Sequence, residues 1–185
     1  MTVAVEVVPA TFSLVSFDAS EIARYTAEAA GWAGITDGAV RVEVDQSVPL
    51  AASKVTDGDP IVIWVEGGAF EDPRTIRQLS PNAVQTVAVR LLSRIADRRR
   101  PGFEDAPGDD ALSVPQLDGW DVWALGRASR RGLEVNQQRW RYRFRNRHGF
   151  SDAADRAFDR LWAAEELTWA ELAEVCESTA ALRLK

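Results

Sequence analysis

Alternating apolar and polar positions predict the strands in the first half of the chain. Residues 39–45 (AVRVEVD) place three valines on one face and charged side chains on the other, which is typical of a half-buried strand. Residues 61–66 (IVIWVE) are almost continuously apolar, as in a central strand. The valine-rich segment 2–8 predicts another strand, and residues 12–17 predict a hairpin partner for it.

Apolar residues three and four positions apart predict five helices. Asp18 with Glu21, and Thr168 with Glu171, have the residue types and spacing of helix caps. Pro81 suits the first position of a helix, where its missing N–H costs nothing. The helices are expected near residues 19–31, 81–100, 115–131, 152–164 and 169–181.

A second alternation, in the segment RWRYRFRNRHGF from Arg139 to Phe150, combines arginine with aromatic residues. In an extended chain its aromatic side chains would share one face and its arginines the other, so we expect a strand near 139–145. With strands mostly in the first half and helices in the second, the predicted fold class is α+β.

The arginine–aromatic segment has two interpretations. The simpler is a sheet strand with a buried aromatic face and a solvated arginine face, since arginine also discourages edge-to-edge aggregation. The functional one is a surface that binds an acidic protein or a nucleic acid through 127–147, because arginine forks match phosphate geometry and exposed aromatic rings can stack on bases. Burial of Trp140, Tyr142 and Phe144 discriminates between them.

The helix near 81–100 carries a second basic strip. Arg90, Arg94 and Arg98 are four residues apart, and like charges at that spacing repel unless loop acids such as Asp109 or a bound anion offset them. The candidate binding residues for an anion or acidic partner are therefore Arg139, Arg141, Arg143, Arg145, Arg147, Arg90 and Arg94.

The chain has 185 residues, a length that suits one domain spanning 1–185, with an internal boundary loop at 101–113. Its net charge is −6, yet 20 of its 22 basic residues are arginine, as expected of a GC-rich bacterial coding sequence. Residues 127–147 carry eight arginines and one acid, and acidic segments flank them. If those acids pair with the arginines, the charges neutralise each other within the fold. If they do not, this acidic protein carries a basic surface.

Several kinds of site are excluded by residue type. His148 is the only histidine, so HExxH zinc sites and Cys/His fingers cannot form within one chain. Neither a Walker A loop nor a GxSxG motif is present, and the Gly67-Gly68 pair favours a tight turn. The helix expected near 169–181 is too acidic to read DNA, and Cys176 lies on its apolar side. We expect no catalytic residue, no metal and no cofactor.

No apolar run reaches the roughly 18 residues of a membrane span, and no basic region precedes the first apolar residues. The single cysteine is compatible with a reducing compartment. These features predict a cytoplasmic protein without a membrane partner.

A strand at 61–66, a loop and a helix bearing RLLSRIAD are similar in order to the core of zincin-like bacterial domains. Arg90 and Arg94 stand where that family has its two histidines, so the resemblance implies a metal-free relative of the scaffold.

The sequence favours a non-enzymatic interaction or structural protein from a bacterium, with the arginine-rich segment as its binding surface. One alternative is a small-molecule enzyme with a carboxylate/arginine pocket, which requires a concave site holding a carboxylate of perturbed pKa. Another is a homo-oligomer or complex subunit that uses tryptophan-rich surface as its interface.

Overall fold

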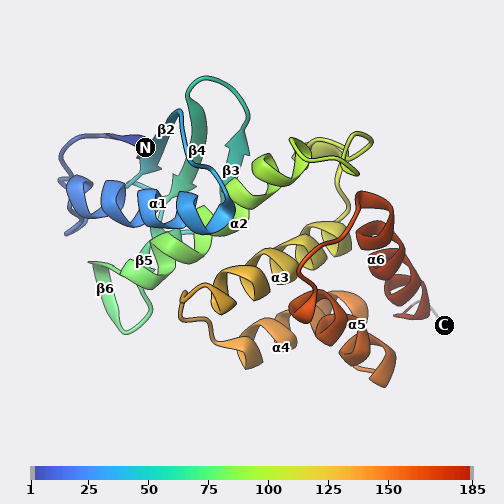
Figure 1. The fold of residues 1–185 in the computed structure, drawn as a ribbon. Coiled ribbons are helices and arrows are strands. Elements are labelled where there is room, and N and C mark those ends of the chain that lie inside the picture. Colours follow the sequence, from blue (N-terminus) through green and yellow to red (C-terminus); the bar gives the residue numbers. More distant parts are fainter. Residues whose placement is uncertain (1–2, 184–185) are drawn as a thin grey trace. The chain divides into compact units, whose positions relative to one another are not determined.

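The computed structural model describes residues 3–183 and confirms an α+β fold with N-terminal strands (Figure 1). The chain divides into two compact units, Met1–Ile95 and Ala96–Lys185. This division falls inside the helix α2 (Pro81–Arg98) and not in the predicted boundary loop at 101–113. The single-domain organisation stays a prediction.

A four-stranded mixed sheet forms the centre of the first unit, in the order β1-β2-β4-β3. Three strands run parallel, and the edge strand β3 is antiparallel to β4. The strands are β1 (Ala4–Val8), β2 (Ala39–Asp45), β3 (Ser53–Thr56) and β4 (Ile61–Glu66). The strands expected at 39–45 and 61–66 therefore form at their predicted positions, whereas residue 2 of the expected strand 2–8 lies outside the described residues.

The alternation of β2 fixes its register with β4. Val40 lies beside Ile61 and Val42 beside Ile63, and all four side chains are buried. Helix α1 (Ala19–Ala33) connects β1 to β2 and packs on β1. Asp18 caps this helix by accepting hydrogen bonds from two backbone N–H groups, as its spacing with Glu21 predicts.

The hairpin expected between 2–8 and 12–17 is wrong, because β1 pairs in parallel with β2 through the α1 crossover. Only an isolated bridge at Ser16 remains in the second segment. After β4, the Gly67-Gly68 pair forms the tight 3-10 turn η1 (Gly67–Ala69). A short hairpin follows, made of β5 (Glu71–Asp72) and β6 (Thr75–Leu79), and leads into α2.

Helices make up most of the second unit, and α3 packs on the other three that follow it (Figure 1). Ser113 caps α3 with a capping box, and Thr168 and Glu171 form the box predicted for α6. Trp120, Trp123, Phe103 and Phe158 fill the core between these elements. The elements are η2 (Asp109–Ala111), α3 (Val114–Arg130), α4 (Gln137–His148), α5 (Asp152–Ala163) and α6 (Trp169–Arg183).

The strand predicted near 139–145 is wrong, because this segment is the helix α4. A pattern that repeats every two residues also repeats every four, and residues four apart share one face of a helix. Trp140, Phe144 and His148 follow this spacing, and the last two are buried. The segment also contains no β-branched residue, and Asn136 caps its first turn by accepting a hydrogen bond from the Arg139 N–H.

A buried ion cluster joins the end of α2 to α3 within the second unit. Both carboxylate oxygens of Asp97 accept hydrogen bonds from Arg127, at 2.8 and 2.6 Å, and the indole N–H of Trp120 also donates to Asp97. The Arg127 guanidinium lies 3.7 Å from the centre of the Trp123 ring. This arrangement pairs both buried charges and makes them part of the core.

Candidate functional site

The inner face of α4 is fixed by aromatic packing. The rings of Phe144 and His148 stack with their centres 3.7 Å apart, and Phe158 of α5 meets Phe144 edge to face. Phe144 is fully buried, so it cannot stack on a nucleic-acid base. Because Phe144 and His148 are buried, the arginines on the opposite face of α4 point away from the core.

His148 lies 1% exposed between α3 and α6. Its Nε2 is 3.2 Å from the Pro115 carbonyl oxygen, which can only accept, so Nε2 carries the proton of the neutral ring. Nδ1, 2.7 Å from the Thr179 hydroxyl, then accepts a hydrogen bond from it. Burial lowers the pKa of His148 to about 4, against a smaller opposing effect of the bond to Pro115. A neutral, enclosed imidazole of this kind holds α4 in place.

Two of the α4 arginines pair with acids on α5. Arg145 binds Asp155 through two hydrogen bonds of 2.8 and 2.7 Å, and this interaction lowers the pKa of Asp155. Arg141 pairs with Asp159 and lies over the Phe158 ring, 4.4 Å from its centre. The neutralisation expected from flanking acids therefore occurs at these two arginines, and Arg143 also pairs with an acid, on α3.

Arg143 points to the other side, toward α3. Its Nε donates to Asp118 at 2.7 Å, and its Nη2 lies 4.0 Å from an oxygen of Asp121. Asp118 is 2% exposed, and its Oδ2 has no hydrogen-bond partner. Burial raises the pKa of Asp118, while the charge of Arg143 opposes that rise. The Arg143 side chain itself stays 50% exposed and covers the Trp140 ring.

The outer face of α4 carries an exposed basic stripe. Arg139, Arg143 and Arg147 are four residues apart, and all three are exposed. Tyr142 is 61% exposed and packs edge to face with Phe150, which is 64% exposed. We call Arg139, Tyr142, Arg143, Arg147 and Phe150 the α4 outer surface. The helix thus divides the five predicted arginines, with three on this surface and two against α5.

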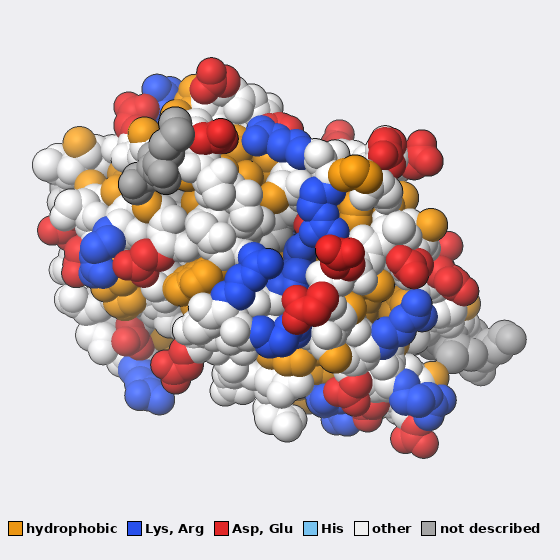
Figure 2. Space-filling view, in the orientation of Figure 1, with side chains coloured by type: hydrophobic (Ala, Val, Ile, Leu, Met, Phe, Trp, Pro, Cys, Tyr) orange, Lys and Arg blue, Asp and Glu red, His pale blue; other side chains and the backbone are white. Residues whose placement is uncertain are grey.

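The three aromatic residues of the segment also divide. Phe144 is buried, Trp140 is half-buried and Tyr142 is exposed. In the same unit α5 carries both acids and arginines and α6 carries Glu171, Glu174 and Glu177, and Figure 2 shows side chains of both signs over these two helices. The α4 outer surface differs because α4 contains five arginines and no acid.

Arg90 and Arg94 lie on α2 in the first unit, where Arg90 is half-buried and Arg94 is 5% exposed. Their part in binding stays a prediction. At the end of the same helix, Arg98 donates to Asp109 at 2.6 Å and to the Pro107 carbonyl. This loop acid provides the internal partner expected for the basic strip.

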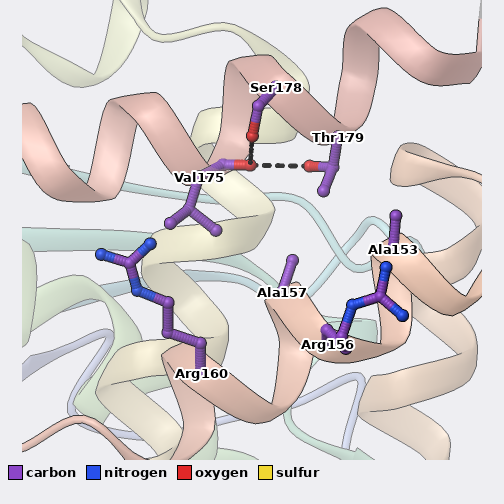
Figure 3. A pocket seen from close by; sticks show the side chains of 7 residues that line it. All are labelled: Ala153, Arg156, Ala157, Arg160, Val175, Ser178 and Thr179. Carbon is purple, nitrogen blue, oxygen red and sulfur yellow. Dashed lines mark hydrogen bonds between the residues drawn. The ribbon is translucent and has the colours of Figure 1, made fainter.

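Sequence reasoning missed a hollow of about 250 Å³ between α5 and α6. Of the described side chains that line it, only Arg156 and Arg160 are charged, and they lie four residues apart on α5 (Figure 3). That spacing is visible in the sequence, but the apolar residues that line the hollow with them belong to two separate helices. Within the described part of the chain, no carboxylate lines this hollow, so Asp118 is not among its residues.

No protein family, curated protein or solved structure matches this chain. The similarity to zincin-like domains therefore stays an expectation from the order of elements. Among residues 3–183, no group of three or more His, Cys, Asp or Glu side chains is arranged to hold a metal ion. Within that same range, no helix combines the length and the apolar character needed to cross a bilayer.

Proposed function

We propose that the protein is a non-enzymatic binding module whose α4 outer surface binds an acidic segment of a partner protein. The observation that carries this proposal is the exposed stripe Arg139, Arg143 and Arg147, with Tyr142 beside it. Like charges at four-residue spacing repel by roughly 0.2–0.5 kcal/mol per pair on an exposed helix, and the pairing of Arg143 with Asp118 offsets part of that repulsion here. An acidic partner would remove that repulsion on binding.

The geometry favours a protein segment over a nucleic acid. Base stacking needs free ring faces, whereas Phe144 is buried and Tyr142 already packs against Phe150. The buried Asp118 and Asp121 lie beside Arg143, and the chain has a net charge of −6, which disfavours a long polyanion. A short acidic peptide can contact the stripe alone, and Arg143 is already held in position by Asp118.

Binding of a 12-residue glutamate-rich peptide, compared with single-stranded DNA of equal charge, tests this proposal. We expect peptide affinity that falls as salt rises, because screening weakens exposed charge pairs. Replacing both Arg139 and Arg147 by Gln should weaken binding about fivefold, from roughly 0.5 kcal/mol for each exposed pair. Arg24→Gln on α1 is the matched control, since Arg24 is also exposed and lies in the other unit.

Three outcomes would overturn the proposal: no peptide affinity at low salt, affinity independent of salt, or equal weakening by Arg24→Gln. Tighter binding of DNA than of the peptide would assign the surface to nucleic acid instead.

A further inference from the structure

The hollow between α5 and α6 has an apolar floor with a cation at each end. Ala153, Ala157 and Val175 supply the floor (Figure 3). The Arg160 guanidinium lies toward Val175, and the Arg156 guanidinium lies on the opposite side of Ala157, toward Ala153 (Figure 3). The two side chains rise from successive turns of α5, so their charged ends lie apart.

The two hydroxyl groups at the hollow are committed to partners inside the protein. The Ser178 hydroxyl donates to the Val175 carbonyl oxygen at 3.2 Å. The Thr179 hydroxyl lies 2.8 Å from that carbonyl and 2.7 Å from His148 Nδ1. Charged donors for a ligand must therefore come from the arginines.

In the part of the chain that the structure describes, neither arginine has a close acid that neutralises it. Among residues 3–183, Arg156 and Arg160 make no ion pair. Arg160 attracts Glu171, but the low pKa of Glu171 is due mainly to its hydrogen bonds with Thr168. Asp159, which lies between the two arginines in sequence, pairs with Arg141.

We propose that this hollow binds a small organic dicarboxylate, with its hydrocarbon chain on the apolar floor and one carboxylate at each guanidinium. Carboxylates match the planar fork of arginine and form charge-assisted hydrogen bonds with it. A ligand with a single carboxylate would satisfy only one end.

The full chain should be titrated with adipate, hexanoate and 1,6-hexanediol, which share a six-carbon chain and carry two, one and no charges. NMR signals of the Ala153, Ala157 and Val175 methyl groups report binding at the floor. We expect adipate to bind about tenfold more tightly than hexanoate, and hexanediol to bind most weakly, because a charge-assisted hydrogen bond is worth a factor of about ten or more.

Arg156→Gln and Arg160→Gln should each reduce the affinity for adipate to about that for hexanoate. Arg139→Gln is the control, because Arg139 belongs to the α4 outer surface and does not line the hollow. Equal affinity for adipate and hexanediol would overturn the dicarboxylate site, as would adipate binding that neither Arg156→Gln nor Arg160→Gln weakens. The acidic peptide is tested at α4 and the dicarboxylate at α5 and α6. The failure of one proposal therefore does not affect the test of the other.

Discussion

Acid should destabilise this protein through its single histidine. The folded state holds His148 neutral with a pKa of about 4, whereas an unfolded histidine titrates near 6.5. Between these values the unfolded chain binds a proton that the folded chain excludes. The stability that neutral His148 contributes is therefore complete above pH 6.5 and is lost as the pH falls toward 4. The pKa difference corresponds to about 3 kcal/mol, at 1.36 kcal/mol per pH unit.

Urea unfolding followed by tryptophan fluorescence at pH 7 and pH 4 measures this loss. Other carboxyl groups titrate near pH 4, so the variant His148→Gln is needed as a reference. The difference in unfolding free energy between wild type and His148→Gln should shrink by about 3 kcal/mol from pH 7 to pH 4. A difference that stays constant across this range would refute the argument.

An NMR titration measures the same pKa without a variant. Because the chain has only one histidine, its ring signals need no assignment among competitors. We expect the midpoint near pH 4, and a midpoint between 6 and 7 would show that the ring is not enclosed as described.

Three further predictions concern the core of the second unit. Asp97→Asn should lower the unfolding free energy by about 3–5 kcal/mol, because it leaves Arg127 buried without its counter-charge; a loss below about 1 kcal/mol in urea unfolding would contradict this. Gly126→Ala should lower the unfolding free energy by about 1–3 kcal/mol, because a Cβ there would lie 2.2 Å from the Trp162 carbonyl oxygen. The control is Gly31→Ala, whose added Cβ meets nothing within 4 Å and which should therefore stabilise α1. Cys176, whose pKa burial raises to about 12, should resist a thiol reagent at pH 8 until urea unfolds the chain, and rapid labelling of the native protein would contradict its burial.

Local sequence patterns predicted the structure correctly where hydrogen bonds within one helical turn, or the separation of apolar and polar faces, determine it. The cap at Asp18 and the box at Thr168 depend on hydrogen bonds within one turn, and both form as predicted. The strands at 39–45 and 61–66 were readable because their side chains separate by face. In contrast, β3, β5 and β6 are short or polar, and no local pattern indicates them.

The error at α4 arose because its alternation fits two periods. A strand explains why every second residue is aromatic, but the contacts that stabilise the helix are made with residues far away in the chain. Asp118 on α3 and Asp155 on α5 pair with arginines on different sides of the helix. Tertiary packing of this kind overrides local pattern, and no window of sequence around 139–145 contains it. The hollow between α5 and α6 was missed for the same reason, since its floor joins two helices.

In our proposal, the α4 outer surface binds an acidic segment of a partner protein. The most direct measurement is an NMR titration of the full chain with the glutamate-rich peptide at low salt. We expect the largest shifts at the Nε–H signals of Arg139, Arg143 and Arg147 and at Tyr142, and we expect these shifts to reverse as salt is added. Shifts confined to other helices, or the absence of any shift at these four residues, would contradict the proposal.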